Sequence, residues 1–206
     1  MPGLPRQLLS SNLSILTEAL TPDVNLVVWQ RALPVHIATF AETVLATGQP
    51  LAESRVLDLV DDEPPVLTDL AAAFSDVEGH TSFVADVTWL VHAYGCLTGA
   101  RRVGLRIRTL NKAMCPRYHV DWVSLRLITT YAGAGSEWLP EGAVPRDLLG
   151  TPSAKPSMPP EKVDPGSVAL FKGERWDGNE GRGIVHRSPP ASAHEGRMIM
   201  TLDWLN

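Results

Sequence analysis

The sequence predicts an α+β fold in which helices pack on one side of a small β-barrel or jelly roll. Over residues 1–100, apolar residues recur at intervals of three and four, a spacing typical of helices. From residue 101 onward, apolar and polar residues alternate, which is typical of strands with one buried face. We therefore expect one compact unit in which residues 1–100 form a mainly helical N-terminal layer and residues 101–206 form the β core.

The first hundred residues contain five expected elements. Apolar residues at helical spacing up to Leu20 predict a first helix, and the apolar run Asn25–Gln30 predicts a strand. A second helix is expected after Pro34, because the first turn of a helix tolerates proline. Val66–Phe74 predicts a short helix, and Thr81–Leu97, with its apolar residues on one stripe, predicts the strongest one.

The second half is expected to consist of strands and long loops. Five segments read as strands: Arg102–Leu110, His119–Tyr131, Ser167–Phe171, Gly183–His186 and Arg197–Trp204. The segment between the second and third of these is rich in proline and glycine, and proline cannot donate the hydrogen bond that a central strand needs. We expect a loop there, and a second, polar loop over residues 173–182.

Composition excludes several classes of protein. The 206 residues are 44% hydrophobic and 20% charged, which supports a folded core. Because 18 Lys and Arg stand against 23 Asp and Glu, the net charge of −5 argues against a duplex nucleic-acid binder. Neither a signal peptide nor an apolar run of membrane-spanning length is evident. We expect a cytoplasmic protein that acts on a small molecule or a peptide, with no membrane partner.

Three residues form a candidate metal site. His119 and Asp121 are two apart on an expected strand, so their side chains share a face at a spacing of about 7 Å along the chain. His186 lies 67 residues later, at the end of another apolar strand. Two histidines and one carboxylate are the ligands of non-haem Fe(II) oxygenases, which keep positions open for substrate and oxygen. A histidine on a strand can equally be structural.

The order of motifs over residues 102–206 resembles a known family. Four segments carry the resemblance: HVDWVSLRLITTY, PGSVALF, GIVHRSPP and EGRMIMTLDW, the last beginning just before Arg197. Their order and spacing resemble the 2-oxoglutarate- and Fe(II)-dependent oxygenases. The chain as a whole also resembles a bacterial family of about this length whose function is uncharacterised. The first hundred residues carry none of the oxygenase pattern.

The resemblance implies a double-stranded β-helix core and a set of roles. His119, Asp121 and His186 would hold Fe(II), and the enzyme would hydroxylate a C–H bond of its substrate. Arg197 would pair with the distal carboxylate of 2-oxoglutarate, a task that suits a planar guanidinium. Tyr131 or Thr201 would assist it with a hydroxyl, Thr129 being a further option. The alternatives are a surface position for Arg197 and a core position for Tyr131.

Residues beside the expected ligands are candidates for the substrate pocket. These are Arg126, Arg187, Ser188 and Trp138. Arg187 and Ser188 would grip an acidic substrate, or they form an exposed turn, while Trp138 follows a glycine-rich turn and would form part of a lid.

A zinc protein is the competing interpretation. Cys115 precedes His119 by four residues, and a thiolate in the site would favour Zn²⁺ over Fe(II). The chain would then be a non-catalytic zinc-binding jelly-roll module linked to metal homeostasis. Cys115 can also be an inert thiol in a loop.

Overall fold

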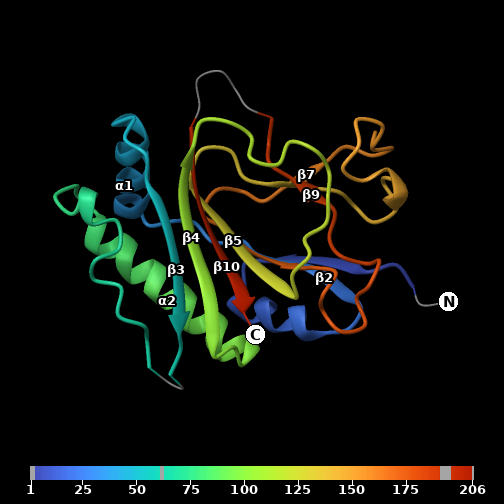
Figure 1. Ribbon diagram of the computed structural model, residues 1–206, viewed down its shortest axis with the longest axis horizontal. Helices are drawn as coiled ribbons and strands as arrows, with labels where there is room; N and C mark the ends of the chain where they lie inside the picture. The colour runs from blue at the N-terminus through green and yellow to red at the C-terminus, as the bar shows by residue number, and fades with distance from the viewer. Residues whose placement is uncertain (1–2, 61–62, 191–195, 206) are drawn as a thin grey trace.

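The computed structural model describes residues 3–60, 63–190 and 196–205, which form three layers (Figure 1). Helices α1 (Val35–Ala46) and α2 (His80–Thr98) cover one face of a large sheet. A small sheet of three short strands lies against the opposite face. The two facing sheets form a jelly roll, as the sequence predicts.

The large sheet has seven strands, all antiparallel to their neighbours except the parallel pair β1–β2. In spatial order they are β1 (Arg6–Ser10), β2 (Val24–Trp29), β8 (Val168–Lys172), β5 (Leu125–Ala132), β10 (Arg197–Leu205), β4 (Arg102–Leu110) and β3 (Ala52–Asp58). The small sheet contains β7 (Glu161–Lys162), β6 (Glu137–Trp138) and β9 (His186–Arg187). Three 3₁₀ helices complete the fold: η1 (Leu13–Leu20), η2 (Ala72–Phe74) and η3 (Arg146–Leu148).

The expected boundary near residue 100 does not separate helices from strands, because β1, β2 and β3 belong to the same sheet as the later strands. The helix expected before Leu20 is instead β1 followed by η1, which begins where the Asn12 side chain accepts a hydrogen bond from Ser14 N. The expected helix Val66–Phe74 is reduced to η2. Ala71 adopts a left-handed conformation with φ 53°, which an α-helix cannot contain.

Most other elements are close to those predicted, with one consequential difference. The strand expected to begin at His119 begins at Leu125, and His119 forms only an isolated bridge to His186. The helices expected after Pro34 and over Thr81–Leu97 are confirmed, as are the expected strands that became β2, β4, β8 and β10. Of the strand expected over Gly183–His186, only His186 lies in a strand, β9. No helix in the described ranges has the length and apolarity that crossing a bilayer requires.

Alternation along the central strands sorts side chains between two apolar layers. In β10, Met198 and Met200 pack toward the helices, whereas Ile199 packs toward the small sheet with Ile128 and Phe171. Arg197 and the other odd-numbered residues of β10 therefore face the space between the two sheets.

Candidate active site

His119, Asp121 and His186 lie together, as predicted. One ligand atom from each side chain can be chosen so that all three lie within 4.8 Å of one another. Nε2 of His186 is 3.4 Å from Oδ2 of Asp121, and Nε2 of His119 is 3.7 Å from Oδ1 of the same carboxylate. Backbone hydrogen bonds of 3.0 Å in both directions tie residue 119 to residue 186. Three ligand atoms this close together could hold a single cation.

Both histidines turn Nε2 toward Asp121, the orientation that a shared metal ion would need. Nδ1 of His119 lies 3.0 Å from the carbonyl oxygen of Arg117, and Nδ1 of His186 lies 3.0 Å from that of Ile184. Because a carbonyl only accepts hydrogen bonds, Nδ1 carries the proton in each ring. The lone pair is then on Nε2, which faces Asp121. Such backbone partners fix the orientation of metal-binding imidazoles in other proteins.

Asp121 is held by Arg126, a residue predicted to line the substrate pocket. Nη1 of Arg126 donates to Oδ2 of Asp121 at 2.7 Å. The same guanidinium donates to both carboxylate oxygens of Asp203, at 2.6 and 3.0 Å. Arg126 thus orients a candidate metal ligand from β5 while Asp203 on β10 anchors it. Nothing local in the sequence signals this link, because Arg126 and Asp203 are 77 residues apart.

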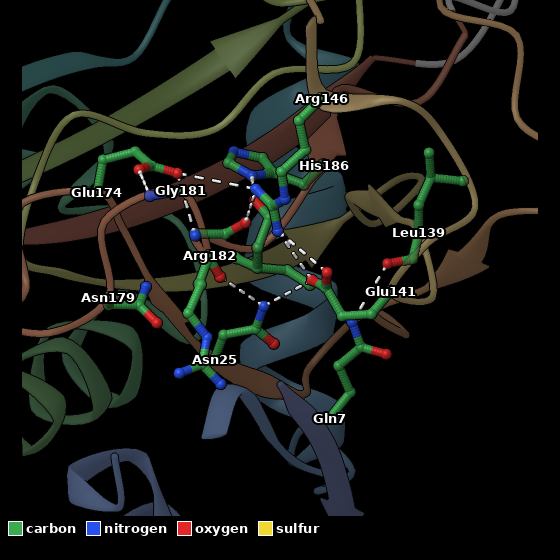
Figure 2. A network of polar contacts seen from close by, with 12 residues as sticks. Gln7, Asn25, Leu139, Glu141, Arg146, Glu174, Asn179, Gly181, Arg182 and His186 are labelled. Carbon is green, nitrogen blue, oxygen red and sulfur yellow. Dashed lines mark hydrogen bonds and ion pairs between the residues drawn. The ribbon is translucent and has the colours of Figure 1, made fainter. Parts of the chain in front are cut away.

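A polar network beside His186 fixes the loop that leads to it (Figure 2). Glu174 accepts hydrogen bonds from the backbone of Gly181 and, at 3.1 Å, from Gly183. Arg146 donates to the Gly183 carbonyl at 2.9 Å and to Glu141 at 3.0 Å. Gly183 is thereby held from two sides, three residues before His186. The sequence reading missed these residues, because they come from separate loops.

Arg197 is buried and only partly hydrogen-bonded. It is 6% exposed, and its Nη2 donates to Ser136 Oγ at 3.2 Å. Its Nε and Nη1 have no partner among the described residues, and burial lowers its pKa to about 10. A buried guanidinium with unpaired donors is destabilising unless an anion joins it. The predicted surface alternative is therefore wrong, and the side chain suits a carboxylate ligand.

The backbone at residue 133 lies so close to that of Arg197 that it requires a glycine. Gly133 has φ +79°, and a Cβ there would lie 2.3 Å from the Gly196 carbonyl oxygen and 2.9 Å from the Cα of Arg197. Only glycine allows this approach, which brings Ser136 to the guanidinium.

The metal triad and Arg197 are connected through the small sheet. Trp138 pairs with His186, and Ser136 is two residues earlier, so Ser136 lies about 7 Å further along the chain. A short dicarboxylate can span such a separation. Trp138, a predicted pocket residue, is 5% exposed in the inter-sheet cluster, and its Nε1 also has no described partner. A further unpaired donor therefore lies in the inter-sheet space.

Tyr131 was predicted to assist Arg197, but the structure places it on the opposite face of the sheet. Its hydroxyl donates to Oδ2 of Asp86 on α2 at 2.7 Å, and its ring packs edge-on against Phe83. Counting alternate residues from His119 fails, because residues 120–124 are not in a strand. The core alternative for Tyr131 is correct.

Thr129 and Thr201 lie on different faces of the sheet. Thr129 has the same parity as Tyr131 within β5, and so it faces the helices, where its hydroxyl is buried. Thr201 has the same parity as Arg197 and is paired with Ile128, an inter-sheet residue. Of the predicted hydroxyls, Thr201 remains on the site's side of the sheet.

We expect Tyr131→Phe to leave 2-oxoglutarate binding unchanged and to lower the free energy of unfolding by about 1 kcal/mol, the usual net value of one hydrogen bond. Asp86 keeps both of its hydrogen bonds from Arg31, at 2.6 and 2.9 Å. Urea denaturation and isothermal titration with 2-oxoglutarate measure the two effects. Weaker binding of 2-oxoglutarate to this variant would contradict the placement of Tyr131.

Arg187 and Ser188 have structural partners in place of pocket positions. Arg187 pairs with Glu137 at 2.7 Å and lies over the ring of Tyr118 at 4.3 Å. Ser188 exchanges hydrogen bonds with the backbone of Cys115, at 2.9 and 3.1 Å. Among the described residues, the group that could hold a metal ion has three members and does not include Cys115. The thiolate that would favour zinc is therefore not part of the group.

His186 gives the metal-free protein a specific acid sensitivity. Burial lowers its pKa to about 4, and the opposing effect of Asp121 is smaller. An unfolded histidine binds its proton near pH 6.5, so between pH 6.5 and 4 the unfolded state carries the extra proton. Stability is therefore lost as the pH falls through this range, by about 3 kcal/mol. Urea denaturation with a chelator present should show this loss in the wild type, and an equal loss in His186→Asn would contradict the assignment.

Comparison with known proteins agrees with this architecture. A family model described as "Protein of unknown function (DUF1826)" matches residues 10–203. No curated protein sequence matches the chain significantly.

Several solved structures are similar to the chain. The dioxygenase for auxin oxidation 1 from Arabidopsis thaliana, in complex with 2-oxoglutarate, is 13% identical with a TM-score of 0.55, over 99% of this chain and 93% of that one. The auxin-oxidation dioxygenase of rice is 17% identical with a TM-score of 0.46, over 98% and 83%. A prolyl-4-hydroxylase from Pseudomonas putida is 10% identical with a TM-score of 0.48, over 96% and 100%. The likeness to the Arabidopsis enzyme shows that the chain shares the jelly-roll fold of that dioxygenase.

Proposed function

We propose that this chain, which belongs to the DUF1826 family, is an Fe(II)- and 2-oxoglutarate-dependent oxygenase. One observation carries the proposal. The inter-sheet space holds both a two-histidine, one-carboxylate cluster and a buried arginine with unpaired donors. The first group suits Fe(II) and the second suits a carboxylate, so together they match a metal with a dicarboxylate co-substrate. The substrate to be oxidised is expected to be a small molecule or a peptide.

Each residue has a defined task in this proposal. His119, Asp121 and His186 would hold the cation, and Arg197 would bind the distal carboxylate of 2-oxoglutarate. Bound iron, with 2-oxoglutarate and oxygen, supplies the oxidising chemistry for attack on a C–H bond. Arg126 keeps the Asp121 carboxylate in place, and the histidine Nδ1 protons stay on backbone carbonyls. The apolar residues between the sheets, among them Phe171 and Ile199, exclude water from this space.

Succinate production tests the proposal. The purified chain, supplied with Fe(II), ascorbate, oxygen and 2-oxoglutarate, should convert 2-oxoglutarate to succinate and carbon dioxide even without its own substrate. The same protein loaded with Zn²⁺ is the control and should form none. Succinate at no more than the zinc-loaded level, after prolonged incubation, would overturn the proposal.

A zinc-binding module remains the second candidate, because two imidazoles and a carboxylate also bind Zn²⁺. Metal analysis of untagged protein, purified without added metal, separates the two candidates. Iron together with succinate production supports the oxygenase. Tightly bound zinc without succinate production supports the module.

A further inference from the structure

A pocket of about 420 Å³ opens beside the metal cluster and has a distinct chemistry. Its lining comes from the residues that follow Asp121, from β4, β5 and β10, and from Arg175 in the loop after β8. Two of its lining residues connect the pocket to the metal cluster. Trp122 follows Asp121 in the chain, and Arg126, which also lines the pocket, donates to Asp121 at 2.7 Å.

The lining carries an excess of positive charge. The lining contains three arginines, Arg106, Arg126 and Arg175, and one carboxylate, that of Asp203. Asp203 accepts hydrogen bonds from Arg106 at 2.7 Å and from Arg126 at 2.6 Å, and Arg126 is shared with Asp121. The guanidinium of Arg175 has no hydrogen bond or ion pair within the described part of the chain. Arg175 is therefore available to pair with an anion that enters the pocket.

The same pocket offers an aromatic surface. Trp122 is 75% exposed, although it is the residue next to a metal ligand. A planar indole in contact with water, beside unpaired positive charge, suits a ligand with a flat apolar part and an acidic group.

We propose that this pocket binds the substrate, and that the substrate is a small organic anion with a planar apolar body. Arg175 and Arg106 pair with the acidic group, and Trp122 stacks on the body. A molecule bound there would contact Trp122, which follows Asp121 in the chain, and Arg126, which donates to the Asp121 carboxylate. The oxidation of this ligand rests on the proposed function, whereas its binding does not.

Equilibrium binding of 2-naphthoate to the full chain tests this proposal, with 2-naphthamide as the uncharged counterpart. The protein is kept metal-free, so that neither turnover nor coordination contributes. We expect saturable binding of 2-naphthoate, and binding of the amide that is about tenfold weaker, the factor that corresponds to one net charged contact. Equal binding of acid and amide, or no saturable binding of the acid up to its solubility limit, would overturn the proposal.

Three variants locate the binding. Arg175→Ala and Trp122→Ala should each weaken 2-naphthoate binding by about tenfold or more. Arg101→Ala removes an exposed arginine that does not line the pocket, and it should bind as the wild type does. If Arg175→Ala binds like the wild type, or if Arg101→Ala loses as much affinity as Arg175→Ala, the pocket is not the site.

A fourth variant separates this proposal from the proposed function. Arg197→Met should keep 2-naphthoate affinity, because Arg197 and Asp203 are six residues apart on β10, about 20 Å at the strand rise. Loss of 2-naphthoate binding in this variant would place the anion at Arg197 and overturn the pocket assignment. Failure of succinate production alone, with 2-naphthoate binding intact, would count against the oxygenase and not against the pocket.

Discussion

Replacing Arg197 with methionine is expected to weaken 2-oxoglutarate binding by at least about 100-fold, the factor for losing two or more charge-assisted hydrogen bonds. The same change should leave the unfolding free energy unchanged or raise it by about 1–2 kcal/mol. An apolar side chain of similar length replaces a buried cation whose Nε and Nη1 have no described partner. Isothermal titration and urea denaturation measure the two effects.

Arg31 supplies a matched control for this prediction. It is also largely shielded from solvent, with 11% of its side chain exposed, but it is paired with Asp86 at 2.6 Å. Arg31→Met leaves that carboxylate without its cation and should lower the unfolding free energy by about 3 kcal/mol, with 2-oxoglutarate affinity preserved. A large loss of stability in Arg197→Met, similar to that in Arg31→Met, would show that Arg197 is a structural residue.

Removing one ligand of the metal cluster should have the second large effect. In His119→Ala, we expect Fe(II) affinity to fall by a factor of about 100 and succinate production to fall to background, since one of three protein ligands is lost. The fold should persist, because 29% of the His119 side chain is exposed. Competition with a fluorescent chelator measures the affinity, and circular dichroism checks the fold.

His92→Ala is the control for that experiment. His92 lies on α2 outside the metal cluster, where its Nε2 is 3.7 Å from the Cys96 sulfur. This variant removes an imidazole from the protein and should bind Fe(II) like the wild type. Equal losses of affinity in His92→Ala and His119→Ala would mean that the iron is bound nonspecifically.

The metal cluster could be predicted from sequence because its signal is local. His119 and Asp121 are two residues apart and do reach one point, although the strand expected there is reduced to an isolated bridge, and the apolar run before His186 marks the partner segment. The alternation in β10 likewise places Arg197 on the correct face. These features depend on neighbours within a few residues, which a sequence displays directly.

The remaining features depend on contacts between distant segments. β3 lies at the edge of the large sheet, where it pairs with β4. Its sequence alone does not distinguish it from a loop, because it becomes a strand through its pairing with β4. Tyr131 was assigned to the wrong face of the sheet because an irregular segment separates it from His119. Side chains alternate between faces only within a continuous strand. Arg197 has unpaired donors because no carboxylate among the described residues faces it, and Gly133 lies against its backbone. No pattern along the chain shows either one.

An anaerobic titration of the metal-free chain with Fe(II) and 2-oxoglutarate tests the central claim most directly. If the three ligands and Arg197 act together, a weak visible charge-transfer band should grow until one equivalent of Fe(II) is bound, and it should require both additions. The band should be absent from His119→Ala, and in Arg197→Met it should need far more 2-oxoglutarate. Absence of the band in the wild type, or a band of undiminished strength in His119→Ala, would contradict the account.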